Sequence, residues 1–191
     1  CVVVENAVNV EAWNYQGDWA ARKKQVITVG QIRLQKDPMR FAQVAKEVLA
    51  QRKDVEFVWV GDGEEESKQA LMSAGVNVLG WKTPDEVKTL LQSSRYYLST
   101  ALWEGMPVSP IEAMLSGCVA ILSDCAGNID IVASEKTGYV FNDVLGAVQQ
   151  ICLLLNDDKL ASGLSDAGRN HSATQYAVER YVHEMNSLIK V

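Results

Sequence analysis

Glu104-Gly-Met-Pro-Val-Ser-Pro-Ile-Glu112, followed at once by Ala-Met-Leu-Ser-Gly117, is the most informative stretch of this chain. Its two carboxylates flank a Gly–Pro turn that leads into an apolar helix. A helix N-terminus offers unpaired backbone N–H groups and partial positive charge, which suit a phosphate or diphosphate. A carboxylate on each side can accept hydrogen bonds from sugar hydroxyls. The stretch therefore predicts a binding site at the start of a helix.

Around this stretch, short apolar runs alternate with helical patterns along almost the whole chain. The runs are continuously apolar, as expected of strands that helices cover on both faces. We expect strands at 26–29, 55–60, 76–79, 95–99, 118–122 and 139–141. We expect helices near 38–51, 64–74, 84–92, 109–116, 128–134, 143–156 and 174–190. This alternation predicts an α/β fold with a Rossmann-like, doubly wound parallel sheet that binds its ligand at the strand carboxyl ends.

Composition and charge narrow the class of protein. The chain has 191 residues, 48% of them hydrophobic, which suffices for one domain with a complete core. Its net charge of −6 disfavours nucleic acid and anionic membrane surfaces as partners. No apolar run approaches the ~20 residues of a membrane-spanning helix, and no signal peptide is visible. Because the chain begins at Cys1 without a methionine, we expect it to be a fragment of a longer protein.

The cysteines and histidines argue against a metal site or a disulfide framework. Only His171 and His183 occur, both near the C-terminus. The four cysteines show neither C-x-x-C spacing nor metal-ligand spacing with histidine: Cys1, Cys118, Cys125 and Cys152. Cys118 and Cys152 lie in apolar runs, where cysteine acts as a small buried hydrophobe. We therefore expect no metal, no cofactor, and a reduced cytoplasmic protein.

Further motifs occur on both sides of the glutamate stretch. They are residues 2–13, Gly30–Pro38 with the pattern G-x-I-x-x-x-K, Val60–Gly63, Asn77–Trp81, Gly127–Asp130 and Thr137–Phe141. Together with the E-x7-E spacing of Glu104 and Glu112, they resemble the retaining "group 1" glycosyltransferases of GT-B fold over nearly the whole chain. The resemblance implies one half of such an enzyme, the half that binds a nucleoside-diphosphate sugar for transfer to an acceptor in polysaccharide or glycolipid assembly.

The resemblance also implies how this half joins the rest of the enzyme. Residues 1–191 form a single donor-binding domain, in which residues 1–20 cross between domains and residues 174–191 form a helix towards a missing N-terminal acceptor domain. We expect a nucleotide sugar and that domain as partners, with peripheral contact to the inner face of the membrane through the missing domain. Two alternatives are a non-catalytic α/β module that binds a nucleotide or a protein partner, and a GT-B sugar-nucleotide epimerase or phosphorylase.

The two glutamates have structural as well as functional interpretations. Ser109-Pro-Ile-Glu112 fits a capping box with proline at the first helical position. The resemblance instead implies that Glu112 accepts hydrogen bonds from the ribose hydroxyls. Glu104 is either a surface-loop carboxylate or, by resemblance, a catalytic group that faces the donor sugar and stabilises positive charge at the anomeric carbon. The amides of the turn between them are expected to face the diphosphate: Gly105, Met106, Pro107 and Val108.

Lys36 is the second candidate catalytic residue. An ammonium group can neutralise the negative charge that builds on a leaving diphosphate. The alternative is an exposed lysine before a helix that Asp37-Pro38 caps. After Gly30 the family pattern has arginine, whereas this chain has Gln31, a neutral hydrogen-bond donor. Arg33, two residues further along, is our candidate to reach the same phosphate in its place.

The remaining candidates lie in two loops. Gly61 and Gly63 follow an expected strand, where glycine allows close approach of the backbone to a ligand or merely reverses the chain. Trp81 and Lys82, by resemblance, line the pocket for the nucleobase. Trp81 as a plain core residue is the alternative.

Overall fold

The computed structural model describes residues 6–15 and 17–189, and the fold below is that of these residues. Its centre is a six-stranded, fully parallel sheet in the order β3-β2-β1-β4-β5-β6. The strands are β1 (Lys23–Val29), β2 (Glu56–Val60), β3 (Val76–Val78), β4 (Ser94–Ser99), β5 (Val119–Ser123) and β6 (Gly138–Phe141). All six expected strands are present, so the doubly wound parallel sheet predicted from the sequence is confirmed.

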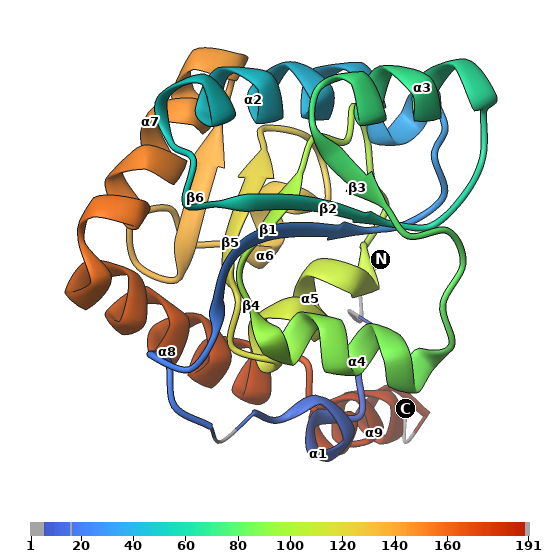
Figure 1. Ribbon diagram of the computed structural model, residues 1–191. Coiled ribbons are helices and arrows are strands. Elements are labelled where there is room, and N and C mark those ends of the chain that lie inside the picture. Colours follow the sequence, from blue (N-terminus) through green and yellow to red (C-terminus); the bar gives the residue numbers. More distant parts are fainter. Residues whose placement is uncertain (1–5, 16, 190–191) are drawn as a thin grey trace.

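Helices cover both faces of the sheet, with α2, α3 and α7 on one side and α4 and α5 on the other (Figure 1). The helices of the described chain, in order, are α1 (Val10–Trp13), the 3₁₀ helix η1 (Leu34–Lys36), α2 (Pro38–Gln51), α3 (Glu65–Ser73), α4 (Pro84–Ser93), α5 (Val108–Leu115), α6 (Asn128–Ile131), α7 (Val144–Asn156), α8 (Asp158–Gln175) and α9 (Val178–Ile189). The three-layer arrangement explains the continuously apolar strands, because neither face of the sheet meets water.

Strand β4 illustrates how the two cores form. Successive side chains of a strand point to opposite faces of the sheet. Accordingly Tyr96 and Leu98 belong to the core under α2 and α7, together with Phe41. Tyr97, between them, belongs to the other core, together with Met114 of α5. All of these side chains are fully or almost fully buried.

Helix α8 falls where the sequence predicts no element. Its 18 residues bury a face at helical spacing in which Leu164 is the one large apolar side chain and the others are small: Ala161, Ser165, Gly168 and Ser172. Such a face carries little hydrophobic periodicity, which is why the sequence pattern misses it. The single helix expected at 174–190 is wrong in detail, since α8 ends at Gln175 and a separate helix, α9, begins at Val178.

The order of the strands decides where a ligand site can form. β1 pairs with β2 on one side and with β4 on the other, so the chain reverses its direction of progress across the sheet between β1 and β4. In doubly wound sheets, ligands bind outside the carboxyl ends of the strands at this switch point. Gly30 follows β1 and Thr100 follows β4, so the loops that begin there carry the candidate site.

Candidate functional site

The loop after β1 lies directly on the loop after β2. Trp59 donates a hydrogen bond from Nε1 to the carbonyl oxygen of Gly30 at 2.8 Å. A Cβ atom on Gly61 would lie 2.0 Å from that same oxygen, and one on Gly63 would lie 2.0 Å from the carbonyl oxygen of Ile32. The two glycines therefore permit contact between two segments of this chain. That contact alone accounts for glycine at both positions.

Lys36 is the last residue of η1 and lies just before α2, which begins at Pro38. Asp37 caps α2 by accepting a hydrogen bond from the N–H of Arg40 at 3.0 Å, and Pro38 occupies the first turn, so the predicted cap is confirmed. From the end of β4, the Thr100 hydroxyl donates to the carbonyl oxygens of Lys36 and Asp37 at 2.8 and 3.0 Å. These bonds place the lysine backbone at the switch point between β1 and β4.

The two candidate catalytic residues meet at this point. Nζ of Lys36 lies 2.5 Å from Oε1 of Glu104, and their side chains are only 17% and 8% exposed. The interpretations of Lys36 as an exposed lysine and of Glu104 as a surface-loop carboxylate are therefore wrong. A third side chain joins them that the sequence analysis missed, because Nε2 of Gln35 lies 3.3 Å from Oε2 of Glu104.

The loop from Glu104 to Val108 passes over the start of α6. The N–H of Glu104 donates to the carbonyl oxygen of Ala126 at 3.2 Å. Gly127 has a φ of +85°, and a Cβ atom there would lie 2.5 Å from the carbonyl oxygen of Gly105. Gly127 therefore lets the loop approach α6 closely and sets the position of Glu104.

Replacing Gly127 by alanine is expected to displace this loop. The positive φ costs an alanine about 1 kcal/mol, and the contact with Gly105 adds to that cost. We expect Gly127→Ala to lower the free energy of unfolding in urea and to weaken binding of a nucleoside diphosphate about tenfold. Gly163→Ala is the control, because Gly163 lies in α8 with open space around it and should gain roughly 0.5–1 kcal/mol. Unchanged affinity in Gly127→Ala would contradict this role.

The amides of the turn are available to an anion, with one correction. Pro107 has no N–H group and is buried, so it cannot contribute as the sequence analysis expected. Among the described residues, the N–H groups of Gly105, Met106 and Val108 donate to no protein acceptor. They stand at the N-terminus of α5, where the helix dipole favours a negative charge.

Glu112 is not part of a capping box. α5 begins at Val108, which places Ser109 and Pro110 inside the helix, and no side chain caps its N-terminus. The Glu112 side chain is half-buried, and burial alone raises the pKa of its carboxyl from 4.5 to about 7. A desolvated carboxylate without a partner is unfavourable for folding. Glu112 therefore has no part in capping α5.

The loop after β3 holds two further candidates, Trp81 and Lys82. Trp81 is 68% exposed, so its interpretation as a core residue is wrong. The N–H of Gly61 donates to the carbonyl oxygen of Gly80 at 2.9 Å, which brings this loop beside the glycine turn after β2. Lys82 pairs with Glu86 at 3.5 Å. Next to it lies a cavity of about 460 Å³ lined by Leu79, Lys82, Asp85, Glu86, Thr89 and Leu90.

The side chains of Gln31 and Arg33 have different surroundings. Gln31 is exposed, and the described residues offer it no hydrogen-bond partner. Arg33 donates from Nη2 to Oε1 of Gln35, so its guanidinium group is turned towards that amide. The structure therefore brings Gly30, Lys36 and Glu104 together. Within the described part of the chain, no hydrogen bond or ion pair joins Gln31, Trp81 or Glu112 to Lys36 or Glu104.

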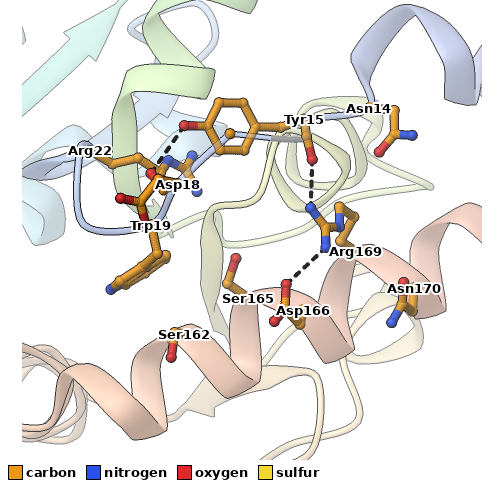
Figure 2. Close-up of a pocket in the computed structure, with 11 residues that line it drawn as sticks. Asn14, Tyr15, Asp18, Trp19, Arg22, Ser162, Ser165, Asp166, Arg169 and Asn170 are labelled. Atoms are coloured by element: carbon orange, nitrogen blue, oxygen red, sulfur yellow. Dashed lines mark hydrogen bonds and ion pairs between the residues drawn. The ribbon is translucent and has the colours of Figure 1, made fainter.

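A separate cavity of about 580 Å³ lies between the residues that precede β1 and helix α8, at the end of the sheet where β1 begins (Figure 2). The two arginines that line it form hydrogen bonds to other parts of the protein. Arg22 is 4% exposed and donates to the carbonyl oxygens of Leu91, Gln92 and Ser116 and to that of Gly117. Arg169 donates to the carbonyl oxygen of Tyr15 and pairs with Asp166 (Figure 2). Hydrogen bonds within the protein therefore fix both arginines of this cavity. The cavity shares no residue with the candidate site.

The described residues contain no cluster of three or more His, Cys, Asp or Glu side chains suited to a metal ion. Within the same part of the chain, no helix has the length and apolarity required to span a membrane. Cys118 is buried, as expected of a cysteine in an apolar run, and Cys118, Cys125 and Cys152 are free thiols. Residues 1–5 and 16 of the expected crossing segment 1–20, and the last two residues of 174–191, lie outside the described residues.

Curated relatives match this chain over most of its length. An *Escherichia coli* protein named UDP-Gal:alpha-D-GlcNAc-diphosphoundecaprenol alpha-1,3-galactosyltransferase is 28% identical over 171 residues, which is 84% of this chain and 43% of the relative. A *Campylobacter jejuni* N,N'-diacetylbacillosaminyl-diphospho-undecaprenol alpha-1,3-N-acetylgalactosaminyltransferase is 29% identical over 70% of this chain and 38% of its own length. The chain thus spans less than half of these relatives.

Solved structures show the same fold. The C-terminal domain of a group 1 family glycosyl transferase from *Francisella tularensis* superposes with a TM-score of 0.78 at 20% identity, covering 90% of this chain and 99% of that domain. *Anabaena* HepE in complex with UDP and glucose gives a TM-score of 0.84 at 14% identity, over 99% of this chain and 56% of HepE. These likenesses identify the fold as one Rossmann-like half of a GT-B glycosyltransferase.

The family assignment rests on a match over most of the sequence. The model of the family described as glycosyl transferases group 1 matches residues 9–171, which include β1–β6 and all the candidate site residues. The chain belongs to the group 1 glycosyl transferases.

Proposed function

We propose that this chain is the donor-binding domain of a retaining glycosyltransferase that transfers a sugar from a nucleoside diphosphate to an acceptor. The observation that carries the proposal is the partly buried pair of Lys36 and Glu104 at the switch point of the sheet. Beside it stand the unpaired amides at the N-terminus of α5, which favour an anion. Together they offer a cation and N–H groups for a diphosphate and a carboxylate for the sugar.

The roles follow from the chemistry of each group. Lys36 neutralises the charge that develops on the leaving diphosphate, and Glu104 stabilises the positive charge that develops at the anomeric carbon. Glu112 accepts hydrogen bonds from the ribose hydroxyls, which satisfies a carboxylate that finds no partner among the described residues. Lys82 lines the cavity that we assign to the base, and Trp81 precedes it in the chain. No metal takes part, since Lys36 and the amides supply the positive charge.

The rest of the enzyme is proposed on the same basis. The acceptor binds to a further, N-terminal domain of the same polypeptide, to which residues 1–20 cross and towards which residues 174–191 are directed. In support, no residue of α9 is fully buried by the described part of the chain. Relatives named for diphospho-undecaprenol acceptors favour polysaccharide or glycolipid assembly in the cytoplasm. Such acceptors imply peripheral contact with the inner face of the membrane.

Calorimetric titration with UDP, GDP and ADP in the presence of EDTA tests the proposal. One of the three nucleotides is expected to bind the 191-residue chain without metal, with a weak affinity in the range of about 10–500 μM, because half of the enclosing cleft is missing. The same chain is expected to transfer no sugar, since catalysis requires the acceptor to be held against the anomeric carbon. If none of the nucleotides binds at millimolar concentration, the proposed function is wrong.

A further inference from the structure

The two oxygens of the Glu104 carboxylate are held by different side chains. Lys36 contacts Oε1 at 2.5 Å, and Nε2 of Gln35 contacts Oε2 at 3.3 Å. The same Nε2 also donates to the carbonyl oxygen of Trp103 at 3.0 Å. Both hydrogens of the Gln35 amide are therefore used on two consecutive residues, one of which is the candidate catalytic carboxylate.

The orientation of the Gln35 amide follows from its neighbours. A carbonyl oxygen and a carboxylate can only accept hydrogen bonds, so the nitrogen of the amide must face Trp103 and Glu104. On its other side, Nη2 of Arg33 can only donate, and it donates to Oε1 of Gln35. The main chain is anchored as well, because the N–H of Leu102 donates to the carbonyl oxygen of Gln35 at 2.8 Å. Gln35 is thus tied to the residues 102–104 by both its backbone and its side chain.

In this arrangement, one side chain can bind the diphosphate while another holds the Glu104 carboxylate. A bound diphosphate attracts the Lys36 ammonium, and the hold of Lys36 on Glu104 weakens accordingly. The neutral amide of Gln35 is not drawn away in this manner and keeps its bonds to Trp103 and Glu104. We propose that Gln35 is a positioning residue, which keeps the Glu104 carboxylate in place when Lys36 engages the diphosphate, and that Arg33 acts through Gln35 rather than on a phosphate. This proposal rests on the proposed function of the same site.

Binding measurements test the role of Gln35 without any acceptor. The readout is the ratio of the dissociation constants for UDP and for a UDP-sugar, which reports the contact with the sugar. The probe is the best binder among UDP-galactose, UDP-N-acetylglucosamine and UDP-N-acetylgalactosamine, measured with the full-length protein. Gln35→Ala should leave the dissociation constant for UDP within about twofold and weaken UDP-sugar binding about tenfold. In turnover of that UDP-sugar, kcat should fall about tenfold, and KM should rise with the weaker binding of the UDP-sugar.

Two further variants separate positioning from packing. Gln35→Glu keeps the shape of the side chain but loses both N–H donors and faces Glu104 with a like charge, so its loss should equal or exceed that of Gln35→Ala. A residue that only fills space would tolerate Gln35→Glu better than Gln35→Ala. Gln69→Ala is the matched control, because Gln69 also donates to a glutamate, Glu65 on the surface of α3, at 2.8 Å. Gln69→Ala should change neither the ratio of the dissociation constants for UDP and UDP-sugar nor kcat.

A double-mutant cycle tests Arg33. If Arg33 acts only by orienting Gln35, then Arg33→Ala should reproduce part of the Gln35→Ala effect, and the double variant should match Gln35→Ala. Additive losses, or weaker binding of UDP itself in Arg33→Ala, would overturn this assignment. Normal UDP binding with an unchanged sugar ratio in Gln35→Ala would overturn the positioning role alone. Absence of all nucleotide and nucleotide-sugar binding by the unaltered protein would remove the proposed function, and this inference with it.

Discussion

Glu112→Gln is expected to make the protein more stable at pH 8 and to impair nucleotide binding at the same time. Burial raises the pKa of Glu112 from 4.5 to about 7, so the native state binds more protons than the unfolded state between these values. The free energy of unfolding therefore falls as the pH rises through this window, and the cost is complete above about pH 7. Glutamine carries no such charge. The variant should show no advantage at pH 4.5 and a growing one up to pH 8.

The size of this gain is limited by partial solvation. The full shift corresponds to about 3 kcal/mol, and screening by water at a half-buried group reduces this to roughly 1–2 kcal/mol. For a domain of this length, that raises the melting temperature by roughly 3–6 °C at pH 8. Thermal unfolding at several pH values measures the effect. Glu47→Gln, at an exposed position of α2, is the control and should show no such pH-dependent gain. A constant advantage at all pH values would contradict the burial argument.

The same variant should lose affinity for the donor. A hydrogen bond to a charged group contributes roughly 1.5–3 kcal/mol, so Glu112→Gln should bind about ten- to a hundredfold more weakly. In the unaltered protein, affinity should rise from pH 6 to pH 8, because ribose hydroxyls donate best to an ionised carboxylate. A nucleotide sugar is the suitable probe, since a free terminal phosphate itself titrates near about pH 6. Loss of stability together with unaltered affinity would contradict the role of Glu112.

Lys36→Met and Glu104→Gln are expected to change nucleotide binding in opposite directions. Lys36→Met removes the cation for the diphosphate and leaves the Glu104 carboxylate, whose side chain is 8% exposed, without its counter-charge. It should weaken UDP binding about ten- to a hundredfold and lower the free energy of unfolding by about 2 kcal/mol. Glu104→Gln frees Lys36 from its 2.5 Å contact and should tighten binding of bare UDP by about three- to tenfold. In the full-length protein, Glu104→Gln should still lower kcat for sugar transfer at least about a hundredfold.

Calorimetry with UDP and EDTA measures the two affinities, and transfer assays on the full-length protein measure kcat. Lys24→Met is the matched control, because Lys24 forms a 2.9 Å ion pair with Asp54 but is 37% exposed and precedes the buried part of β1. Lys24→Met should leave the affinity for UDP unchanged. Weaker UDP binding in Glu104→Gln would mean that this carboxylate contacts the nucleotide itself, and our division of roles between Lys36 and Glu104 would be wrong.

The prediction of the fold succeeded where the pattern was local and apolar. β4 is buried along its whole length, and its run of tyrosine and leucine is recognisable without any knowledge of its neighbours. Helix α8 escaped prediction because its buried face contains Ser165, Gly168 and Ser172, which fit close packing without being hydrophobic. The capping box at Ser109 failed for a related reason. The spacing was correct, but α5 begins one residue before the serine, so the hydroxyl is inside the helix.

The sequence by itself determined the alternation of strands and helices, the Asp37 cap and the candidate residues Lys36, Glu104 and Glu112, because each depends on neighbours a few positions away. Only the tertiary structure decided how the site is assembled. Lys36 and Glu104 are 68 positions apart and meet because β1 pairs with β4, an adjacency that no local pattern encodes. The same pairing brings Gln35 to Glu104. Burial by the folded chain, which the sequence leaves unspecified, raises the pKa of Glu112.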